Sequence, residues 1–522
     1  MTICRVSGEI QGSLIWPHFI PVPIKDVNNP FPILSYILSL YSITLKVLLI
    51  QPFKLNRTPI GGSSYPLGLG YVAAGLIKSG IDVNILDCYL ENPSLATPIQ
   101  SGTLYRIGIA DNDIKNKVLH FDPDVVGINI GFSVQLKAAE AVASLLKSIN
   151  NKLILVAGGA HVSAAPESLN HSSFDYLVAG EGEEAFPRLI NAVAGNPHDI
   201  ESIHGVYYRD PKGDFTSNEP RRLIMNLDDI PFPAYDLMPF EKIWAHRIPY
   251  ANIVATRGCH NNCCFCSIHT ITGRKIRRRS IENILEEIEL LVHRYHVEEI
   301  FFEDDNFTAN MDKAKKLFES LCRKSYHVEF GFRNGIRADK IDKELLTLMR
   351  RAGCARVCFA PESGSQDVLD NIIDKHLKLG DVEKAVVTAR EVGLNVSCFF
   401  VIGIPGETKE DLQETVRYAA RLRRLGCDTV DINCAVPYPG TRLYRQCLEK
   451  HQINEDFDWS RLHTADSIIN TEEFNAYEIM AIRLEAMVAL RETKAEKFQR
   501  SMQNFEAAPL EYSKRFLRKL IR

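Results

Sequence analysis

The stretch RGCHNNCCFC, residues 257–266, places four cysteines close together directly after the apolar pattern NIVATR, residues 252–257. The apolar pattern predicts a buried strand, so the cysteines are expected in the loop at its carboxyl end. Cys259, Cys263 and Cys266 have the spacing C-x3-C-x2-C. Thiolates held this closely bind soft metal ions or iron–sulfur clusters. Cys264 is adjacent to Cys263, and we expect its side chain to point elsewhere.

The cysteine spacing is compatible with two kinds of site. Three cysteine ligands would leave one iron of a four-iron cluster free to bind a small chelating molecule. A zinc site completed by His269 is the alternative, although structural zinc sites commonly use two separate C-x2-C pairs, and the chain has no second pair. Most other cysteines, such as Cys354 and Cys398, lie in apolar runs and are expected to be small buried hydrophobic residues.

The cysteine stretch opens a series of alternating strand and helix patterns over residues 251–450. The six predicted strands are NIVATR (252–257), EEIFFED (298–304), HVEFGFR (327–333), ARVCFAP (355–361), VSCFFVIG (396–403) and TVDINCAV (429–436). Six such units predict a partial TIM-type (βα)6 barrel, in which the loops after the strands carry the chemistry.

A second α/β series precedes it over residues 45–200. The predicted strands are 46–51, 81–86, 124–130, 152–157 and 175–179, with helical patterns between them. They predict a doubly wound parallel sheet, Rossmann-like or flavodoxin-like, whose ligands bind at the carboxyl ends of the strands. GFS (131–133), GGAHVS (158–163) and GEGE (180–183) fall at those ends, either as ligand loops or simply as tight turns.

The remaining segments complete the domain plan. Residues 1–44 predict a poorly ordered extension, and residues 201–250, rich in proline, predict an extended interdomain linker. Residues 451–522 predict a helical C-terminal region that ends in the basic segment YSKRFLRKLIR. We expect that segment to be a solvated or docking helix face, with attachment to a membrane surface as the alternative.

Composition narrows the class of protein. A net charge of -4 argues against a general nucleic-acid binder. The uncharged stretch 31–45 is shorter than the ~20 residues that span a bilayer, and no signal peptide follows Met1. An odd number of cysteines, 13, in a chain without secretory features argues against a disulfide framework. We therefore expect a cytoplasmic protein without a membrane span.

The cysteine motif, with Phe265 before its last cysteine and its place after the first strand of a six-unit barrel, resembles the radical S-adenosylmethionine (SAM) superfamily. The resemblance implies a 4Fe-4S cluster held by Cys259, Cys263 and Cys266. In that family the open iron chelates SAM, and an electron from the cluster cleaves SAM to a 5'-deoxyadenosyl radical.

Later strand ends resemble the SAM-binding stretches of that family in the same order. Each alone also has a structural reading as a turn, a helix cap or a solvent loop. The residues that the resemblance implies are Glu303, Asp304 or Asp305 for the amino end, Arg337 for the carboxylate, Glu362 and Ser363 for the ribose, and Gly403, Ile404 and Gly406 beside the adenine.

The first domain resembles that of the cobalamin-binding subclass, through PDVVGINI (123–130), GGAHVSAAPE (158–167) and DYLVAGEGE (175–183). The implied cobalamin contacts are Ser133, Gly158, Gly159, His161, Gly180, Glu181, Gly182 and Glu183. The motif Asp-x-His-x-x-Gly is absent, so no histidine of that motif is expected below the cobalt.

The motifs and the family resemblances leave three candidate functions. The first is a cobalamin-dependent radical SAM methyltransferase that acts on an unactivated centre of a small-molecule substrate. The second is a cobalamin-dependent oxidative cyclase or rearrangement enzyme similar to the anaerobic magnesium-porphyrin cyclases. The third is a non-enzymatic zinc or electron-transfer module. An enzyme of this kind would take electrons from a flavodoxin- or ferredoxin-type donor. The basic stretch GRKIRRRS, 273–280, is either a solvated loop or a contact for an anionic substrate or SAM.

Overall fold

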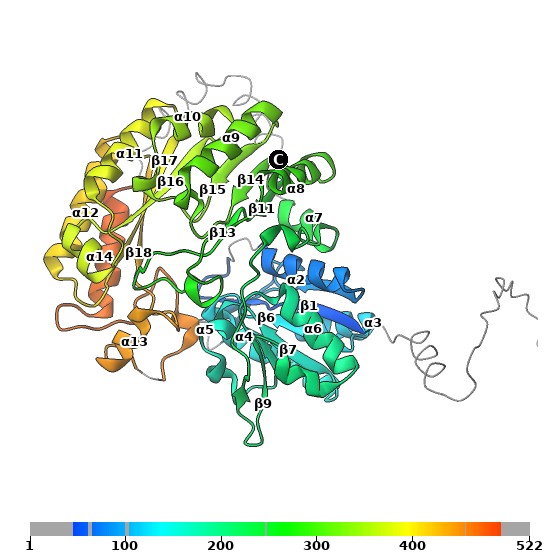
Figure 1. Ribbon diagram of the computed structural model, residues 1–522. Helices are drawn as coiled ribbons and strands as arrows, with labels where there is room; N and C mark the ends of the chain where they lie inside the picture. The colour runs from blue at the N-terminus through cyan, green and yellow to red at the C-terminus, as the bar shows by residue number, and fades with distance from the viewer. Residues whose placement is uncertain (1–44, 61–64, 100–103, 246–247, 455, 492–522) are drawn as a thin grey trace, which may run out of the picture. The chain divides into compact units, whose positions relative to one another are not determined.

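The computed structural model describes residues 45–60, 65–99, 104–245, 248–454 and 456–491. The predicted extension 1–44 and the basic segment 512–522 lie outside the described residues, as do the other positions from 492 onward. The described chain is an α/β protein, with a seven-stranded sheet in its N-terminal part and parallel strands in its central part (Figure 1).

The N-terminal sheet has the strand order β10-β9-β8-β7-β6-β1-β3. Its strands are β1 (Lys46–Gln51), β3 (Asp82–Asp87), β6 (Val125–Asn129), β7 (Ile154–Gly158), β8 (Tyr176–Val178), β9 (Val206–Arg209) and β10 (Phe215–Thr216). The first five pair in parallel and match the five predicted strands within two residues. The predicted doubly wound sheet is therefore confirmed.

Helices cover both faces of this sheet. α3 (Asp111–Phe121) and α4 (Leu136–Ile149) pack on one face, where Ile128 and Leu155 belong to their apolar cluster. α2 (Leu67–Lys78) and α6 (Gly182–Ala194) pack on the other face. The short helix α5 (Ala160–Ala164) follows β7. Parallel strands buried on both faces have apolar side chains along their whole length, as in VLLI of β1.

Two parts of this region differ from the sequence prediction. β2 (Lys54–Asn56), β5 (Leu104–Ile107) and β4 (Ala96–Ile99) form a small antiparallel sheet that was not predicted. Part of the predicted linker pairs as well, because β9 and β10 extend the main sheet as an antiparallel hairpin and α7 (Phe240–Trp244) follows. The prolines do not prevent this, since none lies within β9 or β10.

The central region contains the six predicted parallel strands in two groups of three. They are β11 (Tyr250–Ile253), β14 (Glu299–Phe302) and β15 (Glu329–Phe332), then β16 (Arg356–Glu362), β17 (Asn395–Ile402) and β18 (Thr429–Cys434). A bridge between Ile336 and Phe359 connects the two groups. This arrangement agrees with a partial barrel whose strand ends meet along one edge.

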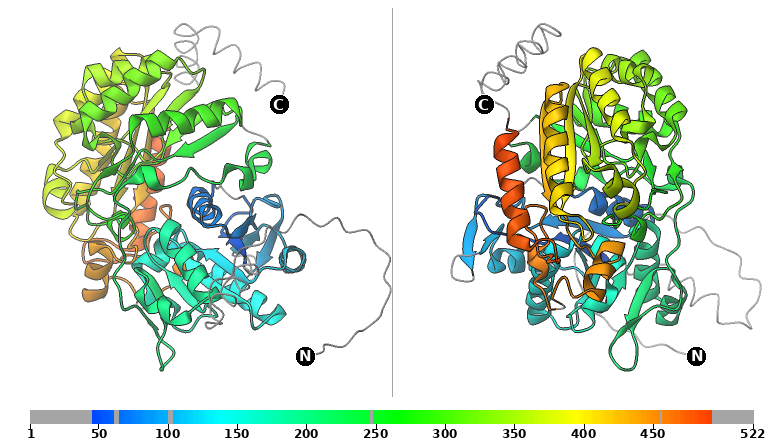
Figure 2. Two further views of the ribbon diagram at one scale, coloured as in Figure 1. Left: turned by 45° about the vertical axis from the view of Figure 1, so that its right-hand side comes forward. Right: turned by 90° about the vertical axis from the view of Figure 1, so that its left-hand side faces the viewer.

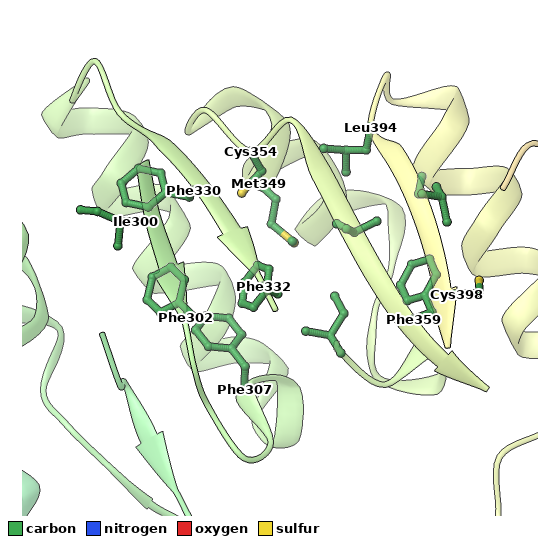
Figure 3. Close-up of a cluster of buried hydrophobic side chains, with 14 of the residues drawn as sticks. Ile300, Phe302, Phe307, Phe330, Phe332, Met349, Cys354, Phe359, Leu394 and Cys398 are labelled. Atoms are coloured by element: carbon green, nitrogen blue, oxygen red, sulfur yellow. The ribbon is translucent and has the colours of Figure 1, made fainter. Parts of the chain in front are cut away.

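Helices α8 to α12 pack against these strands around an aromatic core. Their bounds are α8 (Ile281–His293), α9 (Met311–Lys324), α10 (Lys343–Arg351), α11 (Leu379–Glu391) and α12 (Lys409–Arg424). Phe302, Phe307, Phe330 and Phe332 lie together in the core (Figure 3), with ring centroids 5.4 Å apart for Phe302 and Phe332. Cys354 and Cys398 are buried in the same cluster, which confirms their predicted burial.

The described C-terminal part contains α13 (Arg442–Glu449) and α14 (Ala476–Ala489), and α14 packs on β18 (Figure 2). The described residues 451–454 and 456–475 are mostly irregular, with one short turn of helix, η11 (Trp459–Arg461). Among the described residues, no helix has both the length and the apolar character that crossing a bilayer requires.

Candidate functional site

The cysteine loop, residues 258–276, is closed at its base by β12 (Thr256–Arg257), which pairs antiparallel with β13 (Arg277–Arg278). Gly258 begins the loop with a φ of 94°, and a Cβ there would lie 2.2 Å from the carbonyl oxygen of Lys275. Its N–H donates to Asp305 Oδ2 at 2.6 Å. Only glycine fits this position, because a side chain would force the two arms of the loop apart.

The three cysteines of the motif open onto one cavity of about 350 Å³. Cys264 is 3% exposed, belongs to an apolar cluster and does not line the cavity, which supports its predicted role as a non-ligand. Within the described residues, no three or more His, Cys, Asp or Glu are gathered as around a single metal ion. His269, the fourth ligand of the zinc alternative, also lines the cavity.

The thiols of Cys263 and Cys266 are largely removed from water. Burial raises the pKa of Cys266 to about 12 and raises that of Cys263 as well. Each thiol would stay protonated at neutral pH unless iron takes the place of its proton. The side-chain amides of Asn261 and Asn306 point at Cys259 Sγ, at 3.3 and 3.6 Å.

The three predicted acidic residues after β14 have different surroundings. Asp304 is fully buried, accepts from Thr256 Oγ1 at 2.5 Å and from the Ala255 N–H at 3.2 Å, and has a pKa raised to about 7 by burial. Because the N–H of Ala255 donates to the Asp304 carboxylate instead of to a neighbouring strand, the predicted strand 252–257 is interrupted between β11 and β12. Of the three, Asp305 lines the cavity. Burial raises the pKa of Glu303, which lies outside the lining.

Arg337 and Glu362 lie on the same cavity, as the resemblance predicts for SAM-binding groups. Asp339 holds the Arg337 guanidinium through Nε at 2.9 Å and Nη2 at 3.1 Å. Arg337 Nη1 is buried and has no hydrogen-bond partner among the described residues. A donor fixed on one side and free on the other is suited to bind a carboxylate.

Lys375 was missed by the sequence reasoning. Its Nζ donates to Glu362 Oε1 at 2.8 Å inside the cavity. Glu362, Asp374 and His376 all have positive φ, of 73°, 65° and 51°. Left-handed conformations in residues other than glycine concentrate at functional sites, and here two of them flank the lysine. The sequence around Lys375 has no motif that signals this role.

Among the other predicted cofactor-binding residues, Phe265 also lines the cavity. Four of them do not line it: Ser363, Gly403, Ile404 and Gly406. Ser363 is buried, with its hydroxyl 3.2 Å from Thr415 Oγ1 on α12. The Ile404 N–H donates to Glu407 Oε2 at 2.6 Å. Burial raises the pKa of this glutamate to about 8, so its carboxyl is largely protonated at neutral pH.

In the first domain, His161 is held in place by hydrogen bonds with two serines. Its Nδ1 lies 2.8 Å from Ser133 Oγ and its Nε2 lies 2.9 Å from Ser168 Oγ. The ring is 1% exposed and meets the edge of Trp459. Burial lowers the pKa of His161 to about 4, so the ring is neutral. Both ring nitrogens are used, which leaves none for a metal.

The glycines near His161 and an exposed aromatic ring mark the carboxyl end of the sheet. Gly159 has a φ of 110°, and a Cβ there would lie 2.6 Å from Asn129 Oδ1. At Gly158 a Cβ would meet only Val178 O, at 3.6 Å. Phe132, just after β6, is 63% exposed. An apolar ring left open at the ligand-binding edge of such a sheet fits a large planar ligand.

The glutamates of the GEGE turn face arginines instead of an open site. Glu181 accepts from Arg257 Nη1 at 3.0 Å, from Arg277 Nη1 at 2.6 Å and from the Ile224 N–H at 2.8 Å. Glu183 accepts from Arg257 Nη2 at 2.6 Å. All four charged side chains are largely buried. The turn therefore joins the first domain to the base of the cysteine loop.

Two family models match the chain in the predicted order. The model of the B12 binding domain matches residues 54–190, and the model of the radical SAM superfamily matches residues 253–419.

Several curated proteins are similar over most of the chain. An uncharacterised methyltransferase of Pyrococcus horikoshii is 31% identical over 85% of this chain and 92% of its own. The cytidylyl-2-hydroxyethylphosphonate methyltransferase of Streptomyces wedmorensis is 33% identical over 81% and 86%. An anaerobic magnesium-protoporphyrin IX monomethyl ester cyclase of Rubrivivax gelatinosus is 25% identical over 84% and 75%.

Among solved structures, a radical SAM methyltransferase from Kitasatospora setae with cobalamin and a [4Fe-4S] cluster bound matches with a TM-score of 0.63. The match covers 78% of this chain and 75% of that one, at 16% identity. At this identity the likeness concerns the fold.

Proposed function

The chain belongs to the radical SAM superfamily, with a B12-binding domain ahead of its radical SAM domain, and we propose that it methylates an unactivated carbon or phosphorus centre of a small molecule. Its cofactors are a 4Fe-4S cluster, SAM and cobalamin. When bound, the cluster supplies the electron that cleaves SAM, and cobalamin carries the methyl group.

The chain's own residues would divide the work of binding SAM and the cluster. Cys259, Cys263 and Cys266 would hold the cluster. Arg337 Nη1, which has no hydrogen-bond partner among the described residues, would donate to the SAM carboxylate, and Asp305 on the cavity would accept from the SAM amino group. Glu362, held by Lys375, would accept from the ribose hydroxyls.

Cobalamin would lie over the carboxyl end of the N-terminal sheet, where Phe132 is exposed and Gly158 leaves space. The predicted contacts at Gly180 and Gly182 remain part of the proposal. The carboxylates of Glu181 and Glu183 would act indirectly, by holding this turn against Arg257 and Arg277. His161 would shape the site through Ser133 without binding cobalt.

One observation carries the proposal: three cysteines open onto the same cavity as Arg337 and Glu362, while the fourth cysteine points into apolar packing. The test is turnover of the chain loaded with iron, sulfide and cobalamin. Methylation predicts S-adenosylhomocysteine and 5'-deoxyadenosine together, with label from the SAM methyl group in the product. The first compound to offer is a cytidylylated phosphonate, since a 33% identical relative is named for one.

Oxidative cyclisation is the second candidate, supported by the cyclase relative at 25% identity. It predicts 5'-deoxyadenosine without S-adenosylhomocysteine and no label in the product. That outcome would replace methylation while keeping the same cofactors.

We also propose that the enzyme takes electrons from a flavodoxin- or ferredoxin-type donor and that it is located in the cytoplasm. The absence of a membrane-spanning helix among the described residues is consistent with that location.

A further inference from the structure

The inner face of the first three barrel strands, β11, β14 and β15, carries a second group of polar side chains. On β14, Phe302 packs in the aromatic core beneath the helices (Figure 3), so its neighbour Phe301 points to the opposite, inner face. A Cβ at Gly331 on β15 would lie 3.0 Å from the Phe301 ring. Asn252 pairs with Phe301 in the register of β11 and β14, and Tyr250 lies two residues earlier on the same face.

Arg333, the residue after β15, lies across this inner face. Its guanidinium carbon is 4.1 Å from the centre of the Phe301 ring and 4.6 Å from that of the Tyr250 ring. The side chain is exposed and makes no hydrogen bond or ion pair with any described residue. Stacking on aromatic rings orients a guanidinium and leaves its N–H donors available. Arg333 is therefore a positioned cation with no anion in contact.

Two buried polar atoms on the same face have no hydrogen-bond partner among the described residues. They are the Tyr250 hydroxyl and Asn252 Oδ1, in residues that are 3% and 6% exposed. Buried polar atoms are nearly always hydrogen-bonded in native proteins, because an unpaired one has lost water without gaining a partner. A donor and an acceptor left unpaired beside an available guanidinium indicate a site for a polar ligand.

This group lies beside the cofactor cavity but outside its lining. Asn334, which follows Arg333 directly, lines the cavity, whereas Arg333, Tyr250 and Asn252 do not. On its other side the group meets the first domain, since the ring of Tyr65, just ahead of α2, lies 5.8 Å from that of Tyr250. The group is thus located between the cavity and the first domain.

Acidic residues nearby do not prevent an anion from binding here. Burial raises the pKa of Glu303, while the charge of Arg333 and a hydrogen bond with Asn334 oppose the rise. A carboxyl group with a raised pKa takes up a proton more readily when an anion approaches. Glu329, at the start of β15, lies 3.9 Å from Arg356 Nε, so a different arginine faces its charge.

We propose that Arg333 and Tyr250 form the subsite for an anionic group of the substrate, namely a carboxylate, phosphate or phosphonate. This inference rests on the proposed function and adds the chemical class of the substrate. The guanidinium and the Tyr250 hydroxyl would donate to the anionic oxygens, and Asn252 Oδ1 would accept from a donor next to them. Anchoring one end of the substrate here would hold the rest of it between the SAM cavity and the first domain.

The test is the binding of phenylphosphonate to the full chain loaded with cluster and SAM, measured by calorimetry. Methyl phenyl sulfone is the neutral analogue of similar shape, and SAM keeps the Arg337 site filled. The wild type should bind the phosphonate and not the sulfone. Arg333→Gln should weaken phosphonate binding about 10-fold or more, because a charge-assisted hydrogen bond is lost. Arg417→Gln removes an exposed arginine of α12 and should bind like the wild type.

Tyr250→Phe separates ligand binding from a structural role. It removes only a hydroxyl that has no partner among the described residues, so stability in urea should be kept or rise while phosphonate binding weakens about 5-fold. Three results would overturn the subsite: no phosphonate binding by the wild type, equal binding of phosphonate and sulfone, or unchanged binding in Arg333→Gln or Tyr250→Phe. A chain that takes up no iron or does not cleave SAM would instead contradict the proposed function, before any anion is added.

Discussion

The cysteine loop (258–276) and the GEGE turn (180–183) each follow a strand at the carboxyl end of its sheet, but they use their polar groups differently. The loop directs three thiols into a cavity, where Cys259 accepts from the side-chain amides of Asn261 and Asn306. In the turn, the carboxylates of Glu181 and Glu183 form buried ion pairs with arginines. The same position in a fold can thus serve to bind a ligand or to join two parts of the chain. The number of partners that each polar atom already has distinguishes the two uses.

The largest expected effect is loss of the iron–sulfur cluster when a cysteine of the loop is removed. Cys263→Ala should reduce the iron content after reconstitution from about four atoms per chain to nearly none, because a three-cysteine cluster loses a ligand. Cys264→Ala is the matched control and should keep the iron, at a cost of about 1 kcal/mol in stability from lost packing. Iron and sulfide analysis of both variants checks this. Equal iron loss in the two would mean that Cys264 also binds the cluster.

For the GEGE turn, we expect that removing a buried carboxylate charge lowers the stability of the fold. Glu181→Gln should lower the free energy of unfolding by about 3–5 kcal/mol, since Arg257 and Arg277 would lose the charge that compensates their burial. Glu183→Gln should cost less, because only Arg257 depends on it. Urea denaturation of both variants gives the comparison. A Glu181→Gln variant as stable as wild type would show that the turn does not join the two regions.

The pH dependence of stability tests the neighbouring histidine. The pKa of His161 in the fold, about 4, is below the value of ~6.5 in an unfolded chain, so the unfolded chain binds its proton more readily. Its stabilising contribution is complete above pH ~6.5 and is lost as the pH falls toward 4, by up to ~3 kcal/mol. The difference between wild type and His161→Gln should shrink over this window, while contributions from the other acids cancel. A constant difference would mean that the ring is not held neutral.

The smallest expected effect returns to the cavity. Arg337→Gln should weaken SAM binding to the cluster-loaded chain about 10-fold, the size of one charge-assisted hydrogen bond. Arg333→Gln is the control, because Arg333 stacks on the rings of Tyr250 and Phe301 and lies outside the cavity lining. Equilibrium dialysis with labelled SAM measures both. An unchanged dissociation constant for Arg337→Gln would move the carboxylate site to another cation, with Lys375 as the next residue to test.

Local patterns predicted much of the fold. The apolar runs of β1, β6, β16 and β17 identify strands because such strands are buried on both sides, and the cysteine spacing identifies a loop with a shared ligand. The small β2-β5-β4 sheet was missed, because its strands are two short, half-exposed segments and one only three residues long. Strands of this kind lack a clear alternation of apolar and polar residues.

The site was less predictable where it depends on distant pairs. Glu181 and Arg277 are 96 positions apart, so nothing in either local sequence indicates that they form an ion pair. Lys375 contacts Glu362 from between two residues in left-handed conformations, Asp374 and His376, which the sequence DKH does not demand. The domain boundaries and the roles of the individual site residues remain predictions for the experiments above.

The shared carboxylate of Glu181 also limits how the two domains can be exchanged between relatives. A chimera that receives a first domain without an acidic residue at this turn would leave two guanidinium groups with one fewer anion at a buried junction. Recombination would then succeed most often when the residues at positions 181, 257 and 277 are inherited as a set, although the first lies in the match to one family model and the other two in the match to the other. An exchange made at the boundary between the two family models would therefore cut through this buried ion-pair junction.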